Sequence, residues 1–233
     1  MRSIFLRAFF FCAAVFLASA FSATAEESGG DDARPSRRTE FFVTGGPNLM
    51  VSTGGNSSAP SPIMYSLGFG AEFPAYESVL LQGRASFFSN YYLWDGDDAR
   101  PAEIENRTAT ALSLLLGFDA GRSWVFGENR LSVCGGLGFL LRAAFLAGGV
   151  SSDDEGGSGT TAGDDVSSIN SWFYSGLRFL YPECSVKYLR ALPGGASGMQ
   201  FGAEARFLFP LGAIISGDFP DSMIFSLAAV FQF

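Results

Sequence analysis

The chain has 233 residues, a formal net charge of −8 and no histidine, and 48% of its residues are hydrophobic. Without histidine it cannot carry a Ser-His-Asp triad, a Cys-His protease pair or a His-ligated zinc or haem site. Its 15 basic and 23 acidic residues, with Lys187 as the single lysine, argue against nucleic-acid binding, which needs clustered positive charge. The length favours one domain over two.

The first 25 residues have the pattern of a secretory signal peptide. Two arginines precede an apolar stretch over 9–20, and Ala23-Thr24-Ala25 is an A-x-A cleavage site. The alternative is an uncleaved membrane anchor, for which the apolar stretch is short. We predict a cleaved signal peptide over 1–25 and a disordered periplasmic lead-in over 26–38.

The rest of the chain alternates large apolar residues with small or polar ones, which is the period of a β-strand. In the segment 199–211, for example, the odd positions are apolar and the even positions include Glu204 and Arg206. Short and long connections between such segments alternate along the chain, as in up-and-down barrels. The pattern predicts eight strands, at about 39–53, 62–73, 78–93, 104–119, 130–146, 169–190, 198–211 and 221–233.

Two of these strands interrupt the alternation. Gly45, Gly46 and Pro47 predict a bulge or bend in the first strand. In the strand over 169–190 the phase of the alternation reverses, which predicts a one-residue bulge near 180–182.

The apolar face of these strands is predicted to face lipid, because a soluble barrel would bury it and expose many lysines instead. A closed barrel also satisfies every backbone hydrogen bond within hydrocarbon, which an open sheet does not. Aromatic residues gather near both strand ends, as expected at two membrane interfaces. At the long-loop end these are Tyr91, Tyr92, Trp94, Trp172 and Tyr174, and at the short-turn end Tyr76, Trp124 and Tyr188. The predicted fold is an all-β, eight-stranded antiparallel up-and-down transmembrane β-barrel over 39–233, with both termini in the periplasm.

The last strand alternates up to a terminal phenylalanine, through Phe225, Leu227, Phe231 and Phe233. This ending resembles the C-terminal assembly signal by which bacterial outer-membrane barrels engage their assembly machinery. Over residues 39–233 the chain resembles the small eight-stranded barrels of the OmpA-transmembrane, OmpX and OmpW kind. The resemblance implies a diderm bacterium, an integral outer-membrane location, lipid as the surrounding partner and the barrel assembly machinery as a transient one.

Nine charged residues are predicted to point into the barrel. An eight-stranded barrel is only wide enough for its own side chains, and buried charges must pair, so we expect a salt-bridged plug. The alternative is a narrow conductance path with a slight anion preference, because six of the nine are basic. The nine residues are Glu72, Arg84, Arg107, Arg142, Arg178, Glu183, Lys187, Glu204 and Arg206.

Catalysis is not expected from this interior. Glu183 and Glu204 lie on neighbouring predicted strands and could in principle act as an acid–base pair. Basic residues surround them, however, and the enzymes among the barrels that the chain resembles use histidine. We predict no enzymatic activity and no cofactor.

The longest predicted loop, 147–168, is acidic and rich in glycine and serine. It is either a calcium or host-ligand segment or a solvated mobile loop, and it lacks the residue spacing of a calcium-binding loop. Cys134 and Cys184 are predicted at similar heights on adjacent strands but on opposite faces, which argues against a disulfide.

Three functions follow as hypotheses. The first is a structural or surface-interaction protein of the outer membrane, whose acidic extracellular loops contact a host or environmental ligand. The second is a narrow channel for small hydrophobic or ionic solutes, as the OmpW resemblance implies. The third is a secreted soluble β protein.

Overall fold

The computed structural model describes residues 38–51, 63–76, 78–103, 106–157, 159–192, 198–216 and 223–233. The predicted signal peptide (1–25), nearly all of the lead-in (26–38) and the loop between the first two strands lie outside these ranges. Within them, no helix is both long enough and apolar enough to cross a membrane.

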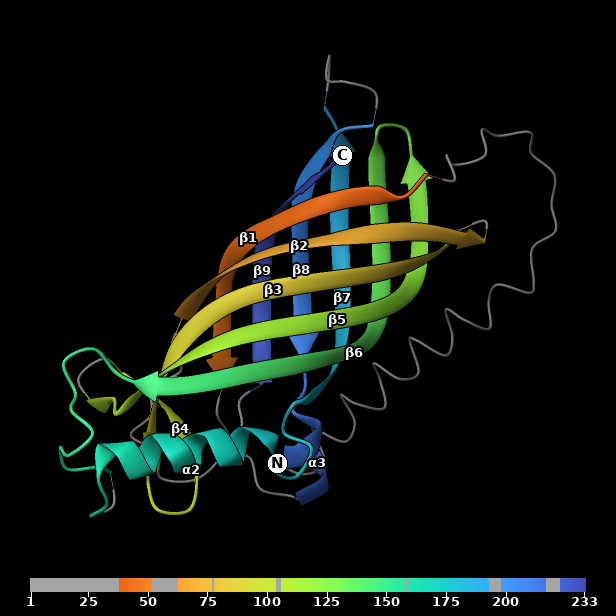
Figure 1. Ribbon diagram of the computed structural model, residues 1–233. Coiled ribbons are helices and arrows are strands. Elements are labelled where there is room, and N and C mark those ends of the chain that lie inside the picture. Colours follow the sequence, from red (N-terminus) through yellow and green to blue (C-terminus); the bar gives the residue numbers. More distant parts are fainter. Residues whose placement is uncertain are drawn as a thin grey trace.

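Eight long antiparallel strands close into a barrel (Figure 1). Their order around the barrel is β2-β1-β9-β8-β7-β6-β5-β3, and pairing of β2 with β3 closes the circle. The first and last strands pair as Phe42↔Gln232 through Val51↔Met223, so the sheet has no open seam there. The eight strands are β1 (Glu40–Val51), β2 (Ile63–Tyr76), β3 (Val79–Trp94), β5 (Ala109–Phe126), β6 (Asn129–Leu146), β7 (Leu180–Ala191), β8 (Gln200–Leu208) and β9 (Met223–Gln232). The expected eight-stranded up-and-down barrel is confirmed.

The two faces of the barrel wall differ as the alternation predicts. On β2, the side chains of Tyr65 and Leu67 are 77% and 69% exposed, whereas those of Met64 and Glu72 are buried inside. Large apolar residues therefore cover the outside, as predicted. The inside holds the buried charged and polar residues, but it also contains large apolar side chains that the small and polar inner face of the sequence pattern did not predict.

Of the bulge or bend predicted in the first strand and the bulge predicted near 180–182, neither bulge occurs. β1 pairs with β2 in one unbroken register from Glu40↔Glu72 to Leu49↔Ile63. What Gly46 provides is close approach, because a Cβ at this position would lie 2.1 Å from the carbonyl oxygen of Leu227 on β9.

The predicted strand over 169–190 is wrong in its first half. Residues Ala162–Tyr174 form helix α2, and β7 begins only at Leu180. From there β7 keeps one register with β6, so the reversed phase marks a change from helix to strand and no bulge. Thr161 caps the helix by accepting a hydrogen bond from the Asp164 N–H at 3.2 Å.

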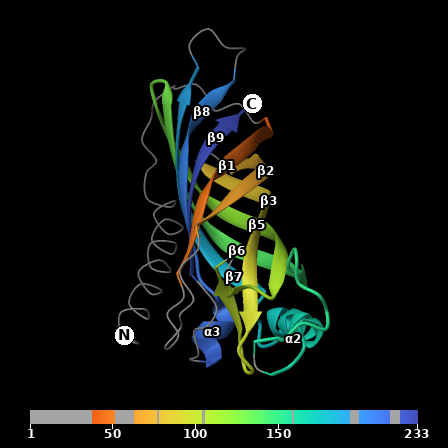
Figure 2. The same ribbon diagram turned by 90° about the vertical axis from the view of Figure 1, so that its left-hand side faces the viewer.

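The two ends of the barrel are unlike (Figures 1 and 2). The end near the C-terminus has tight connections, such as the Gly127–Glu128 turn between β5 and β6. The opposite end, the loop end, carries α2, the short strand β4 (Ala99–Ala102), which pairs with β3, and α3 (Leu211–Ser216).

Candidate functional site

The interior near the tight turns holds a cluster of paired charges, the turn-end cluster. Arg130 donates to Glu40 Oε2 and to Glu72 Oε2, each at 2.5 Å. Lys187 pairs with the other oxygen of Glu72, and the Gln232 amide donates to Glu40 at 2.6 Å. β1, β2, β6, β7 and β9 each supply one of these five residues, so the cluster ties most of the barrel wall together.

A second group of charges, the central cluster, lies further along the axis. Arg84 pairs with Glu204 at 2.8 Å and with Asp119 at 3.0 Å, and Arg206 pairs with Glu183. Each of these side chains is at most 6% exposed. The Phe42 ring lies between the two clusters, 4.5 Å from the Lys187 ammonium and 6.0 Å from the Arg84 guanidinium.

Beyond the central cluster the interior turns apolar. One buried apolar side chain from every barrel strand joins a single packed group, the apolar layer. None of its members is more than 7% exposed. A complete ring of this kind fills the cross-section of the barrel, because an eight-stranded barrel has room only for its own side chains. Its members are Met50, Met64, Phe88, Leu115, Leu140, Tyr181, Leu208 and Ile224.

Helix α2 closes the loop end. Ile169 and Phe173 are fully buried against interior residues of β3, β5 and β6, among them Tyr92. The Phe173 ring lies 4.9 Å from the Tyr92 ring and 4.1 Å from the Arg142 guanidinium. Arg142 also donates to the Tyr92 hydroxyl at 3.1 Å. Helix α2 and the strands β3 and β6 therefore pack together at the loop-end mouth of the barrel.

The acidic segment before α2 is folded rather than a solvated coil. Asp165 is buried and accepts hydrogen bonds from the Thr160 hydroxyl at 2.6 Å and the Gly157 N–H at 2.7 Å. Asp154 accepts from the Ser151 N–H at 2.7 Å. In the described residues, no group of three His, Cys, Asp or Glu side chains is placed to hold a metal ion.

Seven of the nine residues predicted in the lumen lie inside the barrel. Arg142 lies at the mouth, and the other six belong to the two clusters: Glu72, Arg84, Glu183, Lys187, Glu204 and Arg206.

The prediction is wrong for Arg107 and Arg178, which precede β5 and β7 and so lie at the loop end. Arg107 stacks on Tyr91 at 4.8 Å, and Arg178 stacks on Trp172 at 3.5 Å. Sequence reasoning missed Glu40, Asp119 and Arg130. Glu40 and Arg130 lie at the starts of β1 and β6, whereas Asp119 lies in the middle of β5, which continues past the predicted strand end to Phe126. Asp119 has the same phase as the inner residues Ser113 and Gly117, so the alternation of the predicted strand 104–119 already contained the signal that places it inside.

Among the aromatic residues predicted at the long-loop interface, Tyr92 is buried in the interior, and Trp172 and Tyr174 lie on α2 rather than on a strand. The two cysteines lie where the alternation puts them. Cys134 is buried on the inner face, and Cys184 lies on the outer face opposite Gly135. The outer face of β9 carries three residues of the expected assembly signal, Phe225, Leu227 and Phe231, and the fourth, Phe233, directly follows the strand.

No protein-family model matches the chain, and no curated protein is similar to it in sequence. Solved structures are similar in fold. Neisserial surface protein A (NspA) superposes with a TM-score of 0.51 at 10% identity, over 83% of this chain and 95% of that chain. Ail, the attachment invasion locus protein of Yersinia pestis, gives 0.40 at 8% identity, over 84% and 97%. The outer-membrane enzyme PagL gives 0.38 at 13% identity, over 82% and 98%.

At such identities the likeness concerns the fold alone, and the NspA superposition agrees with the strand order and closure described above. The chain therefore has the fold of the small eight-stranded bacterial outer-membrane β-barrels.

Proposed function

We propose that the protein is an integral outer-membrane protein of a diderm bacterium, with a structural or surface-interaction role at the loop end. One observation carries the membrane location: the wall exposes large apolar side chains on its outside while burying ion pairs inside. Phe69, Leu112 and Phe118 are 57%, 56% and 62% exposed, an arrangement that water penalises and lipid favours.

Detergent phase separation tests the membrane location. The barrel enters the detergent-rich phase, and it migrates faster on gels before boiling than after. Recovery in the aqueous phase, with no heat-dependent shift in migration, would support a secreted soluble protein and contradict the proposal.

The orientation is proposed with both termini and the tight turns in the periplasm and the loop end outside the cell. It is tested in a variant without Cys134 and Cys184 that carries one new cysteine. Asp153→Cys, at an exposed loop-end position, is labelled by an impermeant maleimide on intact cells. Glu128→Cys, in the β5–β6 turn, is labelled only after permeabilisation. The reverse pattern would overturn the orientation.

The channel hypothesis is disfavoured by the apolar layer and the two charge clusters. Planar-bilayer recordings of the refolded protein are expected to show no discrete openings. Reproducible single-channel steps that require the folded protein would establish the channel instead.

We propose a non-enzymatic role, in agreement with the absence of histidine from the chain. The carboxylates of Glu183 and Glu204 support it, because each is bound by an arginine and enclosed within the wall. The loop end carries the exposed acidic residues Asp97, Asp153 and Glu155, which suit a host or environmental ligand of positive charge.

We also propose that β9 together with the Phe233 that follows it serves as the assembly signal in the cell. Phe233→Ala is expected to lower the amount of barrel in the outer membrane, with Leu192→Ala as an exposed apolar control outside β9. Equal amounts of the two variants would contradict this role.

A further inference from the structure

The loop-end half of β6 has no strand beside it on the β7 side. The β6–β7 register runs from Asn129↔Arg190 to Phe139↔Leu180, whereas β6 continues to Leu146. The Leu140 N–H still finds the Phe179 carbonyl at 2.8 Å. Beyond it, the backbone groups of β6 that face this side need other partners, because buried backbone groups without them are costly.

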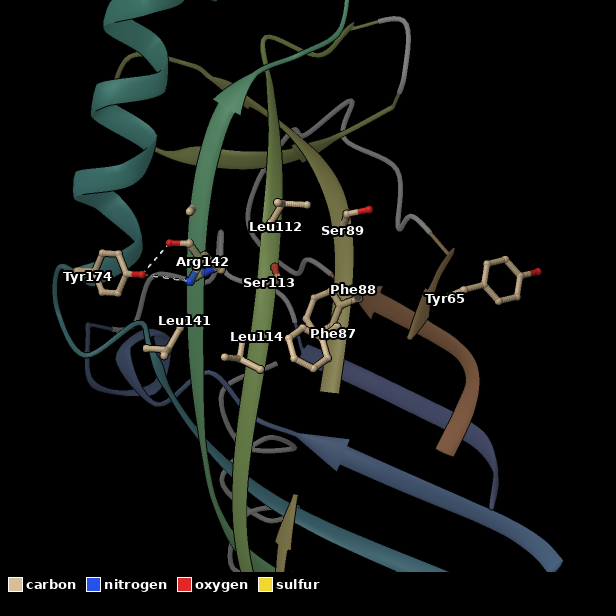
Figure 3. Close-up of a pocket in the computed structure, with 11 residues that line it drawn as sticks. Tyr65, Phe87, Phe88, Ser89, Leu112, Ser113, Leu114, Leu141, Arg142 and Tyr174 are labelled. Carbon is tan, nitrogen blue, oxygen red and sulfur yellow. Dashed lines mark hydrogen bonds between the residues drawn. The ribbon is translucent and has the colours of Figure 1, made fainter. Parts of the chain in front are cut away.

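Helix α2 supplies those partners through two side chains. The Asn170 amide accepts from the Ala144 N–H at 2.9 Å and donates to the Ala144 carbonyl at 3.0 Å. The Tyr174 hydroxyl accepts from the Arg142 N–H at 3.1 Å and donates to the Arg142 carbonyl at 2.6 Å (Figure 3). Each side chain thus binds both backbone groups of one residue, as a neighbouring antiparallel strand does.

The spacing explains why a helix can take the place of a strand. Residues four apart on an α-helix are separated by about 6 Å along its axis. Residues two apart on a strand are separated by about 6.8 Å. Asn170 and Tyr174 therefore reach Ala144 and Arg142 in turn, with α2 lying along the edge of β6.

The chain on both sides of α2 turns through unusual backbone conformations. After the helix, Gly176 and Leu177 have φ angles of +56° and +61°. Leucine rarely adopts this left-handed region, because its Cβ crowds the backbone, so Leu177 is strained in the observed state. Before the helix, Gly149 and Gly159 have φ angles of +87° and +74°.

We propose that α2 is a hinged latch in the barrel wall. It closes the edge of β6 through Asn170 and Tyr174, and its release about Gly176 and Leu177 opens a lateral gate between β6 and β7. Asn170 and Tyr174 make the hydrogen bonds of the latch to the β6 backbone, and Ile169 and Phe173 pack it against the barrel mouth. Between Asn129 and Phe139, in contrast, a backbone ladder holds β6 to β7. Tyr174 also forms one side of a shallow groove on the outer wall, with Leu112, Leu141 and Ala143, so release widens this groove toward the barrel mouth (Figure 3).

Residue-resolved hydrogen exchange of the full chain in lipid nanodiscs tests the latch. The amides of Arg142 and Ala144 are expected to exchange at least ten-fold faster than the β6 amides that pair with β7. Tyr174→Phe keeps the ring but removes both hydrogen bonds, and so speeds exchange at Arg142 by about ten-fold more. Ser171→Ala, on the exposed side of the same helix, is the matched control and leaves the rate unchanged.

Leu177→Gly gives a change of opposite sign. Glycine adopts the left-handed conformation without strain, which favours the closed latch and slows exchange at Arg142 and Ala144 several-fold. The proposal is overturned if these two amides exchange at the rate of the amides paired with β7, and if Tyr174→Phe shifts both groups equally. In that case α2 separates from β6 only when the whole barrel unfolds.

Discussion

The two ends of the barrel interior are closed by different chemistry. At the turn end, side chains of the strands themselves meet as ion pairs, with Arg130 and Lys187 sharing Glu72. At the loop end, a separate element fills the mouth, and α2 packs Ile169 and Phe173 against interior residues of the wall.

The closure at the turn end depends on the strands of the barrel, whereas the closure at the loop end depends on a helix that can move separately. The turn-end cluster cannot open without unpairing strands, because its members are strand residues. The loop-end closure depends on one helix whose contacts with β6 are made by side chains. Changes at the turn end should therefore affect global stability, and changes around α2 should act locally.

The largest effect is expected for Glu72→Gln. The substitution leaves the buried Lys187 ammonium without its carboxylate, and should lower the free energy of unfolding by about 3–5 kcal/mol. Urea titration in lipid vesicles measures it. The control is Glu128→Gln, whose partner Arg190 lies 3.7 Å away with both side chains more than 60% exposed, and which should change stability by less than about 0.5 kcal/mol. Similar losses in both variants would refute a special role for the turn-end cluster.

Leu140→Ala comes next, because it opens a cavity in the apolar layer. The expected loss is about 3 kcal/mol in the same titration. Its neighbour Leu141 faces outward and is 39% exposed, so Leu141→Ala should cost less, since lipid fills the vacated space. If the outward substitution costs as much as the inward one, the layer contributes nothing beyond ordinary apolar contact.

Asp165→Ala should act locally. The loss of its carboxylate leaves the Thr160 hydroxyl and the Gly157 N–H unpaired, at a cost of about 2 kcal/mol. Proteolysis within 148–161 should then accelerate by about 30-fold while urea unfolding of the barrel stays unchanged. Asp153→Ala, at an exposed position of the same segment, serves as the control. A matching fall in global stability would show that this segment and the barrel unfold together.

The smallest effect is expected for Thr161→Ala, which removes the N-cap of α2. A loss of about 1 kcal/mol is typical and should appear as faster hydrogen exchange in the first turn of the helix. Ser167→Ala, on the exposed side of α2, should leave those amides unaffected. Equal exchange in the two variants would mean that packing alone holds the helix start.

The faces of the strands could be predicted because alternation records them directly. Glu204 and Arg206 are separated by one residue, so they must share a face, and the structure places both inside. Contacts between residues on distant strands could not be predicted in this way. Glu40 and Arg130 meet across 90 positions of sequence, and their meeting depends on how far each strand is offset around the barrel. The period of two says nothing about that offset.

The sequence contains signals that could have predicted helix α2. Ala162, Val166, Ile169 and Phe173 follow helical spacing, and Thr161 with Asp164 is the capping pattern of a helix start. The aromatic residues of 172–174 equally suit a strand at a membrane interface, so the residue pattern alone is compatible with either structure. What decides between the two is the packing of Ile169 and Phe173 into the mouth.

The apolar layer also bears on how the barrel folds. Its eight members come one from each strand, so any arc of fewer strands leaves part of the ring facing water. Met50 and Ile224 are register partners on β1 and β9, the strands most distant in sequence. The ring is complete only when these two strands meet, which couples its burial to the final joining of the sheet and makes barrel closure cooperative.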